Sequence, residues 1–219
     1  MAGERRKFRR EGEEKRRDAL ITAALDLISE GGQGSATVRA IADRAGVTPG
    51  LIRHYFQTKE DLTREAYRAL MDRMVEDNAA VLEAAPADPA ARLAAFVAAA
   101  LRPPVMDPGR MGLWAGFIHQ VRRDADMAAV HAETYLGYRA RLEEMIAALP
   151  GPREAAAIRR LAIACNGVID GLWLEGCALP GAFEPGELEQ IGLAAVGAIV
   201  GIDLTAHHPL PPPSTEFAP

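Results

Sequence analysis

Apolar residues recur three and four positions apart along most of the chain. This spacing is typical of amphipathic α-helices, and no stretch shows the strict alternation that a half-buried strand requires. Clusters of glycine and proline interrupt the pattern at intervals, and such clusters end helices. The sequence therefore predicts an all-α fold of about nine helices.

Three predicted helices stand close together near the N-terminus. The first ends at a pair of glycines, and Thr37 is a suitable N-cap for the second. Thr48 can cap the third, with Pro49 at the first helical position, where a missing N–H costs nothing. We expect these helices at about residues 16–30, 37–45 and 48–56.

A long fourth helix and five more follow. Thr58 and Asp61 have the spacing of a capping box at the start of the fourth helix. Breaks at proline and glycine then give expected ranges of about 58–83, 90–102, 107–123, 125–149, 153–179 and 185–200. The expected domains are a disordered basic arm (1–15), a small N-terminal domain (16–60), a larger helical body (61–203) and a flexible Pro-rich tail (204–219).

The composition does not change the predicted fold, but it excludes some classes of protein. The chain has 219 residues, of which 49% are apolar and 25% charged. Without an apolar run of about 18 residues we expect no membrane span, and the charged N-terminus is unlike a secretory signal. Cys165 and Cys177 lie 12 residues apart on one predicted helix, roughly 18 Å, which is too far for a disulfide. A reducing cytoplasm is the expected location.

The charge is distributed unevenly. Residues 1–60 carry 12 Lys and Arg against 9 Asp and Glu, whereas the remainder carries 13 against 21. A basic end on an acidic body favours a polyanion partner at the N-terminal end. The arm before the first helix could order along DNA, or it could be a solvated tail.

The second and third helices flank a tight turn at Gly46, which is the layout of a helix-turn-helix. Val47, Ile52 and Phe56 are spaced to face inward, so the residues between them face outward. Arg53 can donate two hydrogen bonds to guanine in a major groove, while His54 and Tyr55 can reach phosphates. The plainer alternative is a solvated polar helix face.

The text AALDLISEGGQGSATVRAIADRAGVTPGLIRHYFQTKEDL resembles the DNA-binding domain of the tetracycline-repressor (TetR) family. The resemblance covers about a quarter of the chain, with the pattern T-x-x-x-I-A-x-x-A-G-V-x-x-G-x-x-x-x-Y-F-x-x-K-x-x-L. It implies a homodimer that binds a double-stranded DNA operator, and a C-terminal bundle that binds a small-molecule effector. By position, the DNA-binding residues would be Thr37, Arg39, Thr48, Pro49, Gly50, Leu51, Arg53, His54, Tyr55 and Lys59.

The recognition helix departs from the commoner family text G-T-L-Y-H-Y-F, because Leu51 removes a hydroxyl and Arg53 replaces a tyrosine. GLIRHYF, MGLWAGF and NGVIDGLWLEG instead resemble the choline-responsive, BetI-like subgroup. An aromatic cage for a quaternary ammonium is then conceivable. Its candidates are Trp114, Phe117, Tyr135, Asp170 and Trp173, and the alternative is that these residues are ordinary core.

The last two helices carry wide apolar faces that suit an isologous four-helix dimer interface, although they could also simply complete the core of one chain. The candidate interface residues are Ile158, Leu161, Cys165, Leu172, Leu188, Ile191, Ala195 and Ile199. No nucleophile elbow, phosphate loop or metal-spaced Cys/His cluster stands out, so we expect no catalytic residue, metal or cofactor. The competing hypotheses are a regulator without an effector and a helical enzyme with a vestigial DNA-binding head.

Overall fold

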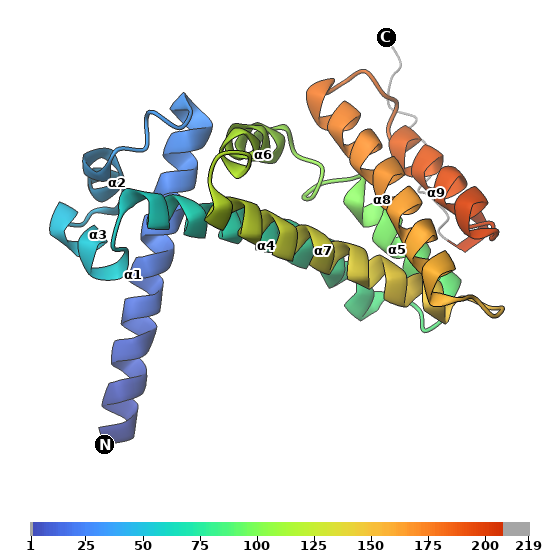
Figure 1. Ribbon diagram of the computed structural model, residues 1–219, viewed down its shortest axis with the longest axis horizontal. Coiled ribbons are helices and arrows are strands. Elements are labelled where there is room, and N and C mark those ends of the chain that lie inside the picture. Colours follow the sequence, from blue (N-terminus) through green and yellow to red (C-terminus); the bar gives the residue numbers. More distant parts are fainter. Residues whose placement is uncertain (1, 208–219) are drawn as a thin grey trace, which may run out of the picture. The chain divides into compact units, whose positions relative to one another are not determined.

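The computed structural model of the protein describes residues 2–207, with side chains from residue 12 onward. Figure 1 labels its α-helices, and within the described residues no strand is present. The predicted all-α fold is confirmed. The helices are α1 (Ala2–Gly31), α2 (Val38–Ala45), α3 (Pro49–Tyr55), α4 (Lys59–Ala84), α5 (Pro89–Ala100), α6 (Pro108–Val121), α7 (Ala125–Ala148), α8 (Ala155–Ala178) and α9 (Glu187–Val200), followed by the 3-10 helix η1 (Thr205–His207).

The chain forms two compact units. The head unit comprises Met1–Met71 and Gly112–His131, and the body unit comprises Asp72–Met111 and Ala132–Pro219. The expected boundary at residues 60 and 61 is therefore displaced, because the first part of α4 and most of α6 belong with the head. Within the head, the buried ring of Tyr67 packs against Phe117 of α6, with ring centroids 5.0 Å apart.

The N-terminal arm is the first difference from the sequence expectation. Helix α1 begins at Ala2, so residues 2–15 continue the helix instead of forming a disordered segment. The segment is rich in arginine, lysine and glutamate, which are good helix formers, and it contains no proline. Helix α1 ends where predicted, with Gly32 at φ 73° directly after it.

The C-terminal end of the body is the second difference. Leu204, placed in the expected flexible tail, is fully buried, and η1 follows it against α5 and α9. The chain folds back so closely that a Cβ on Gly197 would lie 2.6 Å from the carbonyl oxygen of Ile202. Only glycine fits there, so Gly197 permits this return of the chain. Residues 208–219 of the predicted tail lie outside the described residues.

Caps set the ends of the helices in the head. Thr37 Oγ1 accepts the Ala40 N–H at 3.1 Å, and Gly46 ends α2 in the left-handed region at φ 66°. Thr48 occupies the N-cap position of α3, but its side chain makes no capping hydrogen bond, so proline at the first position is what favours the helix start. The predicted cap at Thr37 is confirmed, and the side-chain cap at Thr48 is wrong.

The core of the head lies where α1, α2 and α3 meet (Figure 1). Ion pairs reinforce the edges: Arg44 binds both carboxylate oxygens of Glu30 at 2.8 and 2.6 Å, and Arg17 pairs with Glu65. The buried apolar side chains that these helices and the start of α4 contribute are Leu20, Ile21, Leu25, Ile28, Ile41, Ile52, Phe56 and Leu62.

The body is built around α5, almost all of whose side chains are buried, and α8 and α9 run side by side against it (Figure 1). Helix α8 is long and apolar enough to pass a test for a membrane span, and core helices of soluble proteins pass the same test. Only 33% of its most apolar window is buried in this chain. The other residues of that window are half-buried or exposed among the described residues.

Candidate functional site

Helix α3 is held from one side only. Ile52 is 2% exposed and Phe56 is 4% exposed, so both anchor the helix in the core of the head as predicted. Val47, which was expected beside them, is half-buried. The guanidinium of Arg17 lies over the Phe56 ring at 5.5 Å and closes the inner side. The opposite side of α3 is left to solvent.

The ten residues that the sequence marked for DNA are all at the surface of the head unit. Thr37, Arg39, Thr48, Pro49, Gly50, Arg53 and His54 are exposed, and Leu51, Tyr55 and Lys59 are half-buried. Among the described residues, none forms a hydrogen bond or ion pair with the side chain of Arg39, Arg53 or Lys59. A Cβ added to Gly50 would meet nothing within 4 Å, so no packing among the described residues demands glycine there.

The first turn of α4, which carries Lys59, is stabilised by side-chain hydrogen bonds and an ion pair. The Thr58 N–H donates to Asp61 Oδ2 at 2.9 Å, and the Asp61 N–H donates to Thr58 Oγ1 at 3.0 Å, so the predicted capping box is confirmed. Arg64 pairs with Asp61 and reaches Asp126 on α7 at 2.5 Å. Burial opposes ionisation of Asp61, but hydrogen bonds from Arg64 and Thr58 outweigh it and lower the pKa of this carboxyl.

A polar cluster lies inside the body unit. Tyr135 on α7 donates its hydroxyl proton to Asp170 Oδ2 at 2.5 Å. Asn166, one turn before Asp170 on α8, donates from Nδ2 to the same carboxylate oxygen at 2.9 Å and to the Tyr135 hydroxyl at 2.6 Å. Burial, together with the hydrogen bond and charge of Asp170, raises the pKa of Tyr135 to about 12.

A second pair adjoins the first. Asn78 on α4 is fully buried and donates from Nδ2 to the hydroxyl of Tyr138 at 3.1 Å. The Tyr138 ring packs on Phe96 of α5 with centroids 5.1 Å apart. Burial raises the pKa of Tyr138, and the charge of Asp170 adds to the shift. Tyr135 and Tyr138 lie three residues apart on α7, so the two pairs are neighbours. We call Asn78, Tyr135, Tyr138, Asn166 and Asp170 the polar cluster.

The proposed aromatic cage is divided between the units. Trp114 and Phe117 belong to the head, where Phe117 is fully buried against Tyr67. Trp173 belongs to the body, and its indole N–H donates to the Val105 carbonyl at 3.0 Å. Phe117 and Trp173 thus have packing roles within their own units, and the structure joins Tyr135 and Asp170 in the polar cluster.

Two of the predicted interface residues are buried within the body unit. Cys165 is fully buried and Leu188 is 5% exposed, so neither can meet a partner. The predicted α8 stripe packs partly within the chain because α8 has apolar residues around most of its circumference. The exposed apolar and small residues on α8 and α9 form a different stripe: Ile163, Ala164, Gly167, Gly171, Leu174, Ile191, Ala194 and Ala198. Of the original set, Ile191 is exposed, and Ile158, Leu161, Leu172, Ala195 and Ile199 are half-buried.

Sequence reasoning missed Asn78, Tyr138 and Asn166. Asn166 stands among apolar residues of α8, four positions before Asp170, and an amide at a core position followed by a carboxylate on the same face is a detectable signal. Asn78 gives no such signal, because it follows Glu76 and Asp77 in a charged stretch that reads as solvent-facing.

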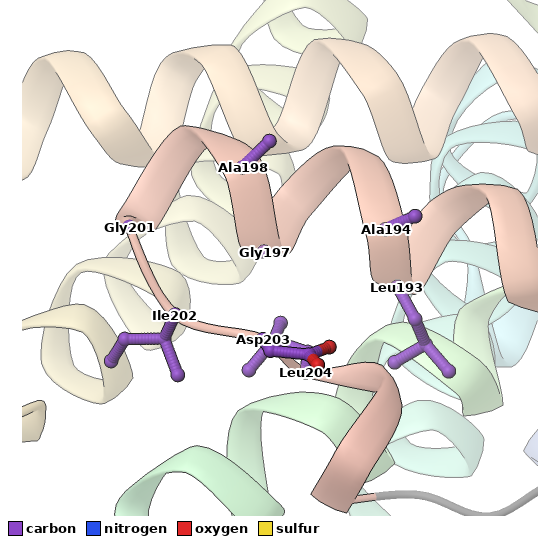
Figure 2. A pocket seen from close by; sticks show the side chains of 8 residues that line it. All are labelled: Leu193, Ala194, Gly197, Ala198, Gly201, Ile202, Asp203 and Leu204. Atoms are coloured by element: carbon purple, nitrogen blue, oxygen red, sulfur yellow. The ribbon is translucent and has the colours of Figure 1, made fainter.

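A surface hollow of about 250 Å³ lies at the end of α9, where the returning chain crosses Gly197 (Figure 2). Its lining is mostly aliphatic, and its carboxylate, Asp203, accepts hydrogen bonds from the N–H and hydroxyl of Thr205 at 3.0 and 2.5 Å. This hollow contains no residue of the polar cluster, so it is a feature of the C-terminal fold. Its lining residues are Leu193, Ala194, Gly197, Ala198, Gly201, Ile202, Asp203 and Leu204.

Two family models match the chain. Residues 20–66 match "Bacterial regulatory proteins, tetR family", and residues 89–201 match "BetI-type transcriptional repressor, C-terminal". Among curated relatives, an HTH-type transcriptional regulator BetI of Burkholderia thailandensis is 33% identical over 170 residues, which cover 77% of this chain and 85% of that protein. The BetI of Rhizobium meliloti is 31% identical over 160 residues, which cover 73% and 76%.

Solved structures of transcriptional regulators have the same fold. A transcriptional regulator from Pseudomonas aeruginosa PAO1 superposes with a TM-score of 0.76 at 30% identity, covering 89% of this chain and 95% of that one. A regulator from Saccharomonospora viridis in complex with choline superposes with a TM-score of 0.67 at 19% identity, covering 82% and 94%. At that identity the second match supports the fold alone.

An exposed helix-turn-helix on an all-helical body, matched at both ends by regulator families, defines a bacterial transcriptional regulator and excludes the enzyme hypothesis. The chain belongs to the TetR family, and its body is of the BetI type.

Proposed function

We propose that this regulator is a homodimeric repressor that binds a pseudo-palindromic operator through α2 and α3 and leaves it when a small-molecule effector binds the body. The observation that carries the proposal is the one-sided anchoring of α3. Ile52 and Phe56 are buried, whereas Arg53 and His54 between them are exposed. An α-helix held from behind in this way fits the major groove of B-DNA.

Each outward side chain has a role that its chemistry supports. Arg53 donates two parallel hydrogen bonds to guanine O6 and N7 and reads the base. Lys59 and the N-terminus of α4 bind phosphate, since helix N-termini favour anions. Thr37, Arg39, Thr48, His54 and Tyr55 donate to the DNA backbone, and Pro49, Gly50 and Leu51 line the approach. The open space around Gly50 supports close contact between the α3 backbone and the groove.

The exposed stripe on α8 and α9 is the proposed dimer interface. Ile163, Leu174 and Ile191 are between 41% and 46% exposed and share this stripe, and contiguous exposed apolar patches mark interaction sites. Within residues 2–207, a Cβ added to Gly167 or Gly171 would meet nothing within 4 Å, so a partner backbone could approach closely. A second copy would cover this stripe in an isologous four-helix contact. Binding to a palindromic operator would then require the two α3 helices to lie about 34–36 Å apart.

The effector is proposed to act in the body, and α4 and α7 are proposed to carry its effect. Both helices have residues in each unit, since α4 runs from Lys59 to Asn78 and beyond, and α7 carries Asp126 in the head and Tyr135 in the body. A ligand shifts the DNA-binding equilibrium only by its differential affinity for the two states, typically worth about 1–3 kcal/mol.

The test is fluorescence anisotropy of the full chain with a labelled fragment of the DNA upstream of its own coding sequence. We expect saturable binding that unlabelled fragment of the same sequence displaces and a shuffled fragment does not. Equal affinity for both fragments at physiological salt would contradict an operator-binding role. As a DNA-binding regulator, it is expected to act in the cytoplasm.

A further inference from the structure

The N-terminal half of α1 extends beyond the core of the head unit. The helix begins at Ala2, whereas Leu20 is the first buried side chain among those that the structure describes. Figure 1 shows this part of α1 continuing past α2 and α3. Because the apolar core starts only at Leu20, the function of the preceding helix has to be sought in its charges.

Opposite charges are sorted onto opposite sides of this segment. An α-helix turns about 100° per residue, so the register of α1 places six arginines within an arc of about 140°. Four carboxylate residues fall within about 80° on the other side. We call the six arginines the arginine arc: Arg5, Arg6, Arg9, Arg10, Arg16 and Arg17. The carboxylate residues are Glu4, Glu11, Glu14 and Asp18, and the exceptions to the sorting are Glu13 within the arc and Lys7 among the carboxylates.

The arginine arc continues the side of α1 that packs against the helix-turn-helix. Arg16 and Arg17 precede the buried residues Leu20 and Ile21 by four positions, and residues four apart share one face of a helix. The guanidinium of Arg17 lies over the ring of Phe56, directly after α3, at 5.5 Å. The arc therefore lies on the same side of α1 as the helices proposed to enter the major groove.

This arrangement does not stabilise α1 by itself. Like charges four residues apart on a helix repel each other, and the arc contains two such pairs. Glu65 of α4 pairs with Arg17, and Glu13 and Glu14 have interactions of their own. With one arginine assigned to each of these three carboxylates, the six arginines still keep an excess of three positive charges. A polyanion relieves the repulsion, and the carboxylates on the other side favour one orientation of α1 towards it.

We propose that the arginine arc binds the phosphate backbone of the operator beside the groove that α3 enters. This inference rests on the proposed DNA-binding role and adds to it a contact that does not read the base sequence. The arc is about 18 Å long from Arg5 to Arg17. Duplex DNA carries one charge per about 1.7 Å of its axis, so an arc of this length meets several phosphates. Contacts to phosphate raise the affinity for every sequence and leave the base preference unchanged.

The experiment compares two double variants of the full chain, each of which removes two positive charges from α1. Arg9→Gln with Arg16→Gln removes them from the arc, and Lys7→Gln with Lys15→Gln removes them from outside it. Glutamine is a good helix former, so circular dichroism should show wild-type helix content for both. Fluorescence anisotropy at several salt concentrations measures the affinity of each protein for the operator fragment and for the shuffled fragment.

We expect the arc variant to bind both fragments at least about fivefold more weakly than wild type, because a dimer would lose four charge contacts. The slope of affinity against salt should fall by about two or more, since each phosphate contact contributes about 0.9. The lysine variant should stay within about twofold of wild type. Equal losses in the two variants would show that only the net charge of the segment matters and would overturn the proposal. A loss confined to the operator fragment would mean that the arc reads bases, which also contradicts it.

The remaining outcomes separate this inference from the proposed function. If wild type prefers the operator fragment and the arc variant binds DNA as wild type does, this inference alone is overturned. If wild type binds the two fragments equally, the proposed function is contradicted instead. Co-sedimentation with phosphatidylglycerol vesicles tests another anionic partner. Vesicle binding that the arc variant loses, with DNA binding unchanged, would assign the arc to a membrane surface and overturn its assignment to DNA.

Discussion

Thr58 and Asp61 exchange two hydrogen bonds across the first turn of α4, at 2.9 and 3.0 Å, and the same carboxylate also pairs with Arg64. Asp61 thereby joins the N-cap of the helix that carries Lys59 to a salt bridge that reaches Asp126 on α7. The N-terminus of α4, where we propose that Lys59 binds a DNA phosphate, is thus held in place by two hydrogen bonds and a salt bridge.

Thr58→Ala removes one half of this exchange and should lower the free energy of unfolding by about 1 kcal/mol. Urea denaturation monitored by circular dichroism measures the loss. Gln57→Ala, the preceding exposed residue, is the matched control and should stay at the wild-type value. Identical midpoints for both variants would show that the capping box contributes nothing to stability.

The capping box also sets a dependence on pH. The folded state lowers the pKa of Asp61, so its contribution to stability is complete above the unfolded pKa of about 4 and disappears as the pH falls through the lower folded value. Asp61→Asn lacks this carboxylate, so the denaturation midpoints of the variant and the wild type should approach each other as the pH falls below 4. Denaturation midpoints between pH 7 and 3 test this, and a constant difference across the range would contradict it.

Arg53 and Lys59 should differ in the kind of DNA binding that they support. Arg53→Ala should cost about 1–3 kcal/mol on the operator and relax base preference at one position per half-site. Lys59→Ala should weaken binding to all sequences evenly and reduce the salt slope by about one. Anisotropy titrations with single-base operator variants at several salt concentrations separate the two. An even loss for Arg53→Ala would mean that Arg53 binds only phosphate.

Ile52→Asp should unfold the head, because it puts an unpaired charge at a position that is 2% exposed. The expected loss is about 3 kcal/mol or more. His54→Asp, two residues away on the exposed side of α3, should change stability by about 0.5 kcal/mol or less. Thermal unfolding of both variants measures the contrast, and similar melting temperatures would contradict the inward orientation of Ile52.

Gly171→Arg and Ile191→Arg should dissociate the proposed dimer, since each places a long charged side chain in the exposed stripe of α8 and α9. Light scattering after size-exclusion chromatography should report a dimer for wild type and a monomer for each variant. Ala140→Arg on the exposed side of α7 is the control and should remain dimeric. A dimer that withstands both stripe variants would locate the contact elsewhere.

Helical periodicity and capping residues were sufficient to predict the helices to within a few residues, except at the two ends of the chain. The structure at those two ends could not be predicted from the spacing of apolar residues. Residues 2–15 lack an apolar stripe but keep high helix propensity, and Leu204 lies beyond the last periodic segment but finds a place against α5 and α9.

The inward side of α3 was predictable because one short helix has one core to face. The apolar face of α8 was not, since a helix that is apolar nearly all round gives no single direction, and Cys165 was assigned to the wrong side. The polar cluster could not be predicted from local sequence patterns, because Asn78 and Tyr138 are 60 residues apart in the chain and meet only in the folded structure.

Helix α7 carries two residues of different units little more than one helical turn apart. His131 accepts or donates a 2.7 Å hydrogen bond with Tyr67 in the head, and Tyr135, four residues later, binds Asp170 in the body. Four residues rise about 6 Å along a helix. In the proposed mechanism, the signal from an effector in the body would cross only this short stretch of the α7 backbone to the residues of the head unit.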